Sequence, residues 1–485
     1  MTTAAGTSGK PNIILIMADQ LRGDCLGCVG NKIIQTPNID AIAAGGVVLT
    51  RAYTSVPSCT PARAVLLTGL SPWKNGMLGY GKMAPEYHHE MPRMLHDAGY
   101  RTVAVGKMHY HPQRSPRGFE VMLIDESSRR EDPGFISDYH QWFEQKEPGK
   151  DPNATFQRGV GWNENKWADY ALDENLHPTY WTGQQAVAQI LAHDSSKPLF
   201  LKVSFARPHS PYDAPSRFAS IYDWKDMPAP WIGEWAGKFK SWRKTRSPAF
   251  GDFGEEYAKR ARRHYYGNVT FIDEQVGRII DALKKRGMYD DSLILFTADH
   301  GDMLGDHYHW RKTYAYEGSA SIPMALRWPA SMNATVPRGS RISRVAELRD
   351  VLPTFLDAAG APLPGDLDGK SLLSLLRDEG ASWREYIDLE HYIAYDLHNY
   401  WTGLTDGRQK YIYFRPSGEE QLFDLERDPG ECHDLAREPA YREALDAWRA
   451  RLVSHLAPRG KKWVKHGKLV KDRRGQLYSP NHPRG

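Results

Sequence analysis

The stretch from Asn12 to Gln20, NIILIMADQ, decides the fold of this 485-residue chain. Residues 12–18 are almost continuously apolar, and strands buried on both faces of a parallel sheet show such runs instead of alternating apolar and polar residues. The run passes directly into Asp19 and Gln20. It therefore predicts a central buried strand with polar side chains at its carboxyl end.

Strands and helices alternate through the first 300 residues. The expected elements are a helix at 36–44, strands at 102–105 and 199–205, a helix at 272–285 and a strand at 292–298. This order predicts an α/β fold, in which helices cover both faces of a mostly parallel sheet. Residues 125–180 and 210–265 are rich in Trp, Tyr, Arg and Gly and have weak periodicity, so we interpret them as long insertions over the sheet.

The pattern changes after Gly360. A short helix is expected at 370–377, strands at 386–391, 409–414 and 421–425, and a helix at 441–456. We therefore predict two domains. Residues 1–383 form the larger domain, and residues 384–485 form a smaller α+β domain with an antiparallel sheet and a tail that is basic after Pro458.

Composition excludes several classes of protein. Hydrophobic residues make up 41% and charged residues 25%, as in ordinary globular proteins. No apolar run approaches the ~18 residues of a membrane helix, and four cysteines are too few for a disulfide framework. The net charge of +4 argues against strong nucleic-acid binding. The start, MTTAAGTSGKPN, lacks the apolar core of a secretory signal, so we expect a cytoplasmic protein without membrane partners.

Chemically active side chains follow four of the predicted strands, and they include Lys107, His109 and His209. Because carboxyl ends of parallel strands meet at one edge of a sheet, these side chains should form one site. The candidate metal ligands are Asp19, Gln20, Asp299 and His300. Carboxylate and amide oxygens suit Ca²⁺ or Mg²⁺, whereas one imidazole shifts the preference towards Mn²⁺ or Zn²⁺.

The segment from Ser58 to Arg63, SCTPAR, is the sharpest local signal. Thr60 suits a helix cap, Pro61 suits the first helical position, and Gly69 ends the helix. Cys59 then lies at a helix N-terminus, where backbone N–H groups and the helix dipole attract anions. Arg63 adds a permanent cation about one turn later.

Residues 59–63, C-T-P-A-R, resemble the C-x-P-S/A-R signature of the type I sulfatases, in which the cysteine is converted to formylglycine. Further motifs of that family occur in order: G-K-M-H at 106–109, P-H-S-P at 208–211, D-H-G-D at 299–302, and Lys312 in W-R-K-T. The resemblance implies an alkaline-phosphatase-like α/β/α sandwich with a smaller C-terminal domain. It also implies a hydrolase that cleaves sulfate esters.

The resemblance further implies a role for each motif residue. Formylglycine from Cys59 is hydrated, one of its oxygens attacks sulfur, and Arg63 stabilises the hydrate. The metal is held by Asp19, Gln20, Asp299 and His300. The remaining roles are binding of the sulfate oxygens by Lys107 and Lys312, protonation of the departing alcohol by His209, and removal by His109 of the proton that expels sulfate.

Three positions depart from the best-known animal members of that family. Gln20 and His300 replace Asp and Asn, which lowers the ligand charge by one and resembles bacterial members such as choline sulfatases and phosphonate monoester hydrolases. Ca²⁺ is the expected ion, with Mn²⁺ or Mg²⁺ as alternatives. Ala62 replaces the commoner Ser inside the signal that a formylglycine-generating enzyme, the implied protein partner, would read.

The expected substrate is a carbohydrate sulfate, because the insertions place many aromatic and cationic side chains above the strand ends. Candidate substrate contacts near the motifs are His111, Arg114, His307 and His309. We expect one or two of the seven tryptophans between Trp162 and Trp242 in the insertions to line the pocket. A phosphonate monoester or phosphodiester hydrolase on the same scaffold, or an inactive protein that binds sulfated glycans, is an alternative. Assembly into a homo-oligomer stays open.

Overall fold

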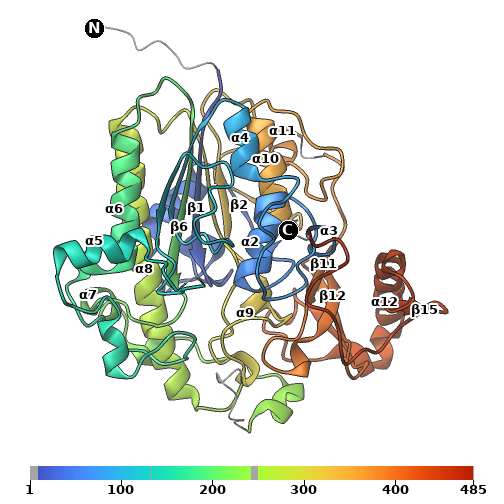
Figure 1. Cartoon of the computed structure of the whole chain (residues 1–485). Coiled ribbons are helices and arrows are strands. Elements are labelled where there is room, and N and C mark those ends of the chain that lie inside the picture. Colours follow the sequence, from blue (N-terminus) through green and yellow to red (C-terminus); the bar gives the residue numbers. More distant parts are fainter. Residues whose placement is uncertain (1–8, 132, 242–249, 379, 484–485) are drawn as a thin grey trace.

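The computed structural model describes residues 9–131, 133–241, 250–378 and 380–483, so Trp242 lies outside the described residues (Figure 1). A central sheet lies between two layers of helices, and a smaller antiparallel sheet follows near the C-terminus. Within those ranges, no helix combines the length and the hydropathy that crossing a membrane requires.

Eight strands form the central sheet in the order β5-β4-β6-β1-β7-β8-β2-β9. Their bounds are β1 Asn12–Asp19, β2 Val47–Leu49, β4 Arg101–Gly106, β5 Val121–Ile124, β6 Leu199–Pro208, β7 Ser292–Ala298, β8 Met324–Arg327 and β9 Ser340–Ile342. Only the pairs that involve β8 are antiparallel in the described sheet. The predicted mostly parallel sheet is therefore confirmed.

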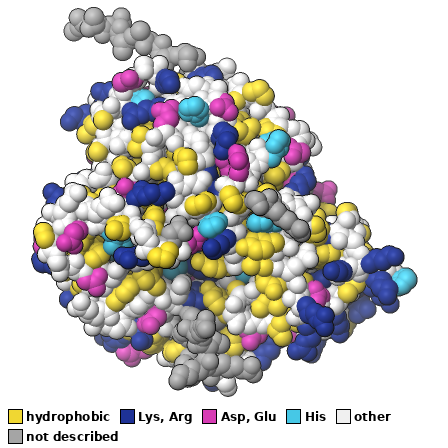
Figure 2. All heavy atoms as spheres, viewed as in Figure 1, with side chains coloured by type: hydrophobic (Ala, Val, Ile, Leu, Met, Phe, Trp, Pro, Cys, Tyr) yellow, Lys and Arg dark blue, Asp and Glu magenta, His cyan; other side chains and the backbone are white. Residues whose placement is uncertain are grey.

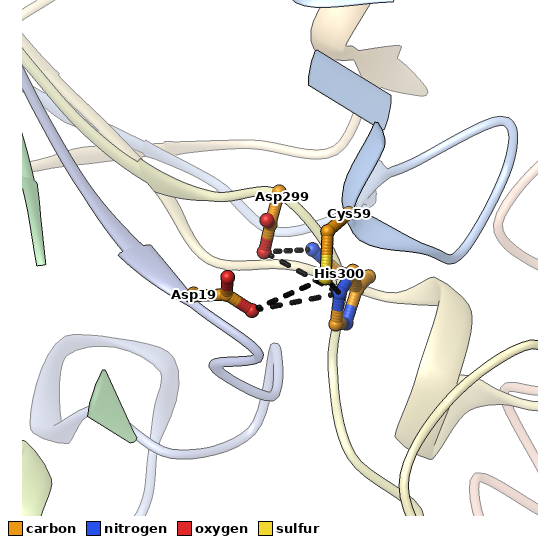
Figure 3. A group of neighbouring side chains, drawn as sticks. All are labelled: Asp19, Cys59, Asp299 and His300. Atoms are coloured by element: carbon orange, nitrogen blue, oxygen red, sulfur yellow. Dashed lines mark hydrogen bonds and ion pairs between the residues drawn. The ribbon is translucent and has the colours of Figure 1, made fainter. Parts of the chain in front are cut away.

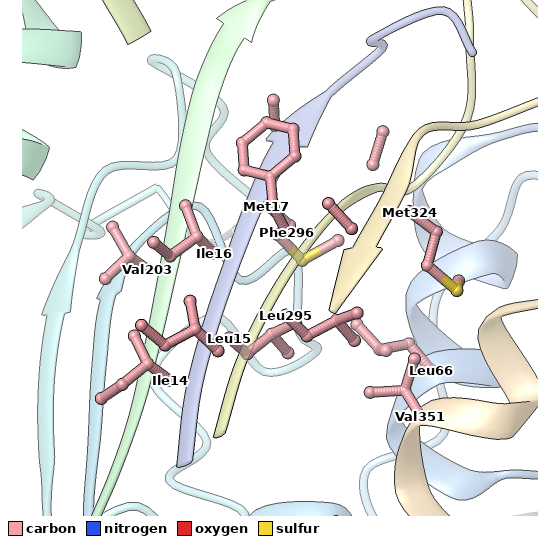
Figure 4. Packing of buried hydrophobic residues seen from close by; sticks show 14 of the residues in the cluster. Ile14, Leu15, Ile16, Met17, Leu66, Val203, Leu295, Phe296, Met324 and Val351 are labelled. Carbon is pink, nitrogen blue, oxygen red and sulfur yellow. The ribbon is translucent and has the colours of Figure 1, made fainter. Parts of the chain in front are cut away.

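Strand β1 occupies the centre of the core, between β6 and β7. Ile14 and Ile16 are fully buried, as are their neighbours Leu15 and Met17, so both faces of the strand are covered (Figure 4). Val203 of β6 and Leu295 of β7 belong to the same apolar cluster. Burial on both faces explains why this segment is continuously apolar in sequence.

Two layers of helices cover the sheet. Helices α6 and α8 lie over one face, and α2, α4 and α10 lie over the other (Figure 1). The bounds are α1 Pro37–Ala44, α2 Cys59–Thr68, α3 Pro72–Asn75, α4 Met91–Asp97, α5 Asp138–Lys146, α6 Pro178–Leu191, α7 Ser216–Ala219, α8 Glu255–Lys285, α9 Glu317–Ala320, α10 Val351–Ala358, α11 Leu373–Arg377 and α12 Arg442–Leu456.

Helix α8 begins at Glu255, well before the expected start at residue 272. The interpretation of residues 255–265 as part of an insertion is therefore wrong. Between Tyr265 and Asp273 every side chain of this helix is buried. Because this middle part is buried all round, it shows no amphipathic stripe and conceals in the sequence that residues 255–264 continue into the helix expected from residue 272.

The C-terminal sheet is antiparallel, in the order β11-β12-β13-β14. Its strands are β11 Ile387–His391, β12 Trp401–Thr405, β13 Gln409–Phe414 and β14 Glu420–Asp424; the remaining short strands are β3 Ala52–Tyr53, β10 Ala346–Glu347, β15 Val464–Lys465 and β16 Lys468–Leu469. Strand β12, WTGLT, was not expected, because Gly403 interrupts its apolar pattern. The predicted fold class is confirmed, whereas the boundary at residue 383 stays a prediction.

Basic side chains gather at the right-hand edge of the molecule in Figure 2, where Figure 1 places α12 and β15. The basic stretch around β15 and β16 therefore lies at the periphery, whereas the end of the tail returns to α3, where the backbone N–H of Ser479 donates to the Gly76 carbonyl at 2.9 Å.

Candidate active site

Four side chains from distant parts of the chain meet at the carboxyl edge of the central sheet (Figure 3). Asp19 ends β1, Asp299 and His300 directly follow the neighbouring parallel strand β7, and Cys59 is the first residue of α2. One oxygen, nitrogen or sulfur atom from each lies within 4.8 Å of the others. All four side chains are buried.

The register between β1 and β6 shifts at this edge. Ala18 pairs with Phe205, whereas Asp19 pairs with Pro208, and the Asp19 carbonyl accepts a hydrogen bond of 3.0 Å from the backbone N–H of His209. The irregularity brings the loop after β6 over the end of β1. Gln20 and His109 both have positive φ, +69° and +60°, a conformation that side chains other than glycine rarely adopt and that clusters at functional sites.

Helix α2 starts two residues earlier than expected. Ser58, not Thr60, is the N-cap residue, and Pro61 is the third helical residue, still inside the first turn where a missing N–H costs nothing. Thr60 Oγ1 instead accepts from the backbone N–H of Gly81. The expected end at Gly69 is confirmed, and Cys59 does lie at a helix N-terminus.

Lys312 and His300 contact Cys59. Its Sγ lies 3.2 Å from Lys312 Nζ and 3.2 Å from His300 Nε2. Burial and Asp19 would raise the pKa of the Cys59 thiol, but Lys312, Lys107 and His300 outweigh them, and the pKa lies below its usual value. A lowered pKa increases the fraction of reactive thiolate.

Arg63 forms hydrogen bonds to several residues of the site. Its side chain is fully buried, and Nε donates to Asp299 Oδ2 at 2.9 Å, while Nη1 donates to the Lys107 carbonyl at 2.6 Å. Nη2 also approaches Asp19 Oδ2 at 3.4 Å. We call Asp19, Cys59, Arg63, Asp299 and His300 the catalytic floor.

The donor atoms of the floor, together with Gln20, fit a divalent cation. His300 Nδ1 donates to the Gly301 carbonyl at 2.9 Å, which leaves Nε2 with a lone pair on the side of Cys59. The Gln20 amide oxygen accepts from Lys312 Nζ at 2.8 Å, while its Nε2 donates to Asp302. Two carboxylates, one imidazole nitrogen and one amide oxygen are thus collected in a buried site.

Two histidines flank the floor. His209 Nδ1 donates to the Ser210 carbonyl at 2.8 Å, so Nε2 remains for a substrate. The backbone N–H of His109 donates to Glu126 Oε1 at 2.7 Å. Burial lowers the pKa of both imidazoles well below the usual value, with Lys312 adding to the effect at His209 and Arg129 at His109.

A cavity of about 1110 Å³ opens above the floor and is lined by the predicted residues Cys59, Lys107, His109, His209 and Lys312. Figure 2 shows that this face of the molecule is hollowed near its centre. Other polar and aromatic residues, for which the sequence carries no motif, also line the cavity; they include Tyr80, Glu126, Arg129, Asn163, Glu164, Asn165, Lys166, Arg311 and Tyr395. Trp162 also lines the cavity, as expected for one or two tryptophans of the insertions.

None of the four predicted substrate contacts lines this cavity. His111 turns to Glu131, with Nδ1 2.6 Å from its carboxylate, and Arg114 pairs with Asp138 at 3.1 Å. His307 packs against Trp235, and His309 is fully buried beside Phe239. Closeness to a motif in sequence did not bring these side chains to the cavity, because each finds a partner in its own loop or in the packing below.

Family models match nearly the whole chain. A sulfatase model matches residues 11–361. A model described as N-sulphoglucosamine sulphohydrolase, C-terminal, matches residues 305–457.

This chain is also similar to individual sulfatases and to a solved structure of a related hydrolase. An arylsulfatase from Clostridium perfringens is 38% identical over 95% of this chain and 98% of its own length. A choline-sulfatase from Rhizobium meliloti is 32% identical over 93% of this chain and 87% of its own length. The crystal structure of a phosphonate monoester hydrolase from Agrobacterium radiobacter superimposes with a TM-score of 0.76 at 25% identity, covering 96% of this chain and 100% of that one. The expected alkaline-phosphatase-like sandwich is confirmed by this likeness. The chain belongs to the sulfatase family of sulfuric ester hydrolases.

Proposed function

We propose that this sulfatase hydrolyses carbohydrate sulfate esters, using formylglycine made from Cys59 and one divalent metal ion. The observation that carries the proposal is the meeting of Asp19, Cys59, Asp299 and His300 within 4.8 Å at the N-terminus of α2. Ca²⁺ is the ion we propose, with Mn²⁺ or Mg²⁺ as alternatives, because oxygens dominate the donor set.

The metal would be held by Asp19, Gln20, Asp299 and His300, and when bound it supplies a Lewis acid for the sulfuryl oxygens. Formylglycine at position 59 supplies the attacking oxygen. Lys107 and Lys312 line the cavity beside Cys59, where their charges stabilise the anionic sulfuryl group. Arg63, bound to both carboxylates, fixes the orientation of the floor.

The two histidines handle protons on either side of the sulfate group. His209 keeps Nε2 for the leaving oxygen and donates a proton to the departing alcohol. His109 accepts a proton when sulfate is expelled. An anionic ester beside His209 offsets the cations that lower its pKa in the free enzyme, so binding of the substrate favours the protonated imidazole.

The cavity supports a saccharide as substrate. Its volume of about 1110 Å³ exceeds what a simple aryl sulfate needs, and Tyr80, Trp162 and Tyr395 offer aromatic faces to a sugar ring. Its charged lining is mostly basic, with Arg129, Lys166 and Arg311 in addition to the two lysines, which disfavours a cationic alcohol such as choline. The C-terminal match to an N-sulphoglucosamine sulphohydrolase model also supports a sulfated sugar.

A phosphonate monoester hydrolase is the second candidate, because a hydrolase of that kind shares the fold. The deciding experiment measures kcat/KM of the converted, metal-loaded enzyme for sulfated monosaccharides, 4-nitrophenyl sulfate, choline sulfate and a phosphonate monoester. The proposal expects a sulfated saccharide to exceed the other three by at least about 10-fold, since contacts to remote groups can be used in the transition state. A phosphonate or choline ester that exceeds every saccharide would reject it.

A further inference from the structure

One side of the cavity carries hydrogen-bond donors that have no partner among the described residues. These donors are Trp162 Nε1, Asn165 Nδ2, and Nε and Nη2 of Arg311. All three residues line the cavity, and Asn165 and Arg311 are only 3% and 1% exposed. We call these three residues the donor wall. Buried polar atoms without a partner are uncommon in proteins, so a cluster of them in residues that line one cavity requires a reason.

Neighbouring groups already hold the donor wall in position. Asn165 Oδ1 accepts a hydrogen bond of 3.2 Å from the Tyr257 hydroxyl, which leaves the amide N–H groups as its unsatisfied end. Arg311 Nη1 donates to the Asn163 carbonyl at 2.6 Å. Tyr395 covers the face of the Arg311 guanidinium at 4.4 Å, but the N–H bonds point within the guanidinium plane, where stacking does not satisfy them.

The charge on Arg311 is also unbalanced. The neighbouring cation Arg129 pairs with Glu126 and Glu131, and Lys166 lies 3.5 Å from Glu164. No described Asp or Glu forms an ion pair with Arg311, whose hydrogen bond to the Asn163 carbonyl carries no charge, although its side chain is almost fully buried. A guanidinium cannot lose its proton in proteins. It therefore lacks the anionic partner that a buried cation needs.

The position of the donor wall identifies which part of a substrate it would meet. The Trp162 ring centroid lies 6.0 Å from that of His209, the residue proposed to protonate the leaving oxygen. Arg311 directly precedes Lys312, and its backbone φ of +65° shows that the segment is held in an uncommon conformation. The wall thus borders the side of the cavity into which the alcohol portion extends.

We propose that Trp162, Asn165 and Arg311 form a subsite for an oxyanion, a carboxylate or a second sulfate, on the alcohol portion of the substrate. Arg311 supplies the permanent charge, and Asn165 and Trp162 supply neutral N–H donors. This inference rests on the proposed function, because His209 defines the leaving-group side. It narrows the substrate from sulfated saccharides in general to those that carry another anionic group.

The test compares two matched pairs of substrates. One pair is a sulfated uronic acid and its methyl ester, and the other is a disulfated and a monosulfated hexosamine. In at least one pair the wild-type enzyme is expected to favour the more anionic substrate by 10-fold or more in kcat/KM, and the pair that shows the preference identifies the oxyanion. Smaller ratios in both pairs would overturn the inference.

Two variants test whether the preference for the more anionic substrate arises from the donor wall. Arg311→Gln removes the charge, and Asn165→Asp keeps the shape and the Tyr257 contact while placing a carboxylate in the subsite. Both are expected to lower the discrimination ratio at least 10-fold, with Asn165→Asp reversing it, which loss of folding alone would not do. The control Arg427→Gln removes a cation that is 80% exposed and should keep the wild-type ratio. A preference retained by both wall variants would contradict the assignment.

Binding without turnover separates this inference from the proposed function. Calorimetry measures binding of two pairs of ligands, a sulfate-free uronic acid with its methyl ester and a monosulfated with an unsulfated hexosamine, and neither measurement needs converted Cys59. Tighter binding of the more anionic member of either pair by wild type, lost in Arg311→Gln, would support the subsite even if no sulfate ester were hydrolysed. Hydrolysis of sulfated sugars with equal binding within both pairs would keep the function and reject the subsite.

Discussion

The catalytic floor and the donor wall lie in the same cavity but are built differently. Floor residues end strands or begin a helix, and their charged atoms are paired, as Arg63 is with Asp19 and Asp299. Wall residues stand outside helices and strands, and several of their donors have no partner among the described residues. The difference indicates that the floor is complete before a substrate binds, whereas the wall is completed by the substrate.

Variants of the floor and variants of the wall should differ in their effects on activity. Changes in the floor should impair the reaction with every sulfate ester, because each ester presents the same sulfuryl group. Changes in the wall should alter the choice between esters, because only some alcohols carry groups that reach it.

The largest effect is expected from Cys59→Ala. It removes the precursor of the nucleophile, so kcat should fall by at least about 10³-fold for aryl and saccharide sulfates alike. Steady-state kinetics on both substrate classes measure the loss, and Cys432→Ala, outside the cavity, is the matched control. Unequal losses between the two substrate classes would contradict the expectation that changes in the floor affect all sulfate esters alike.

Metal removal should have the next largest effect. Chelation is expected to lower turnover of all substrates by at least about 100-fold, and added Ca²⁺ should restore it and raise Tm, because a ligand that binds only the folded state stabilises it. Asp299→Asn should lose both responses, whereas Asp290→Asn, with a side chain that is 81% exposed, should keep them. Full activity after exhaustive chelation would contradict the metal assignment.

His209→Gln should separate substrates by their leaving groups. Loss of a general acid costs about 10²–10⁴-fold for a sugar alcohol, which needs a proton to depart, and much less for 4-nitrophenol, which does not. The measurement is the ratio of kcat values for the two substrates, with His433→Gln, 68% exposed, as control. Equal losses would show that His209 does not protonate the leaving oxygen.

The smallest effect is expected where the C-terminal domain supports the segment that carries Lys312. Asn399 Nδ2 donates to Thr313 Oγ1 at 2.7 Å, and Trp401 Nε1 donates to the Thr313 carbonyl at 2.9 Å, next to Lys312. Asn399→Ala should lower the free energy of unfolding by about 1–2 kcal/mol. It should also lower kcat several-fold for all substrates, as measured by denaturant titration and kinetics. Lower stability with unchanged kcat would show that the contact does not position Lys312.

The floor could be predicted from the sequence because local patterns specify it. The apolar run before Asp19 identifies a buried parallel strand, and Cys59 stands at a helix start that Gly69 ends ten residues later. Such patterns depend only on residues that are close in sequence, so they can be recognised without knowledge of the tertiary structure. The exact N-cap was misjudged because Ser58, Thr60 and Pro61 all suit a helix start.

The donor wall could not be predicted in this way. Trp162 and Asn165 come from one loop and Arg311 from another about 150 residues further along the chain, and neither loop has a helical or strand period. Nearness to a motif was misleading for His307 and His309, whose side chains pack beneath the cavity. Only the folded chain shows which loop side chains face the cavity and which lack a partner.

The central claim is tested most directly by correlating modification with activity. Preparations made with different amounts of a formylglycine-generating enzyme give different converted fractions of the Cys59 peptide, which mass spectrometry measures. Turnover of a sulfated saccharide by the same samples should rise in proportion to that fraction and extrapolate to nearly zero without conversion. Undiminished turnover by a sample whose Cys59 is wholly a thiol would contradict the account.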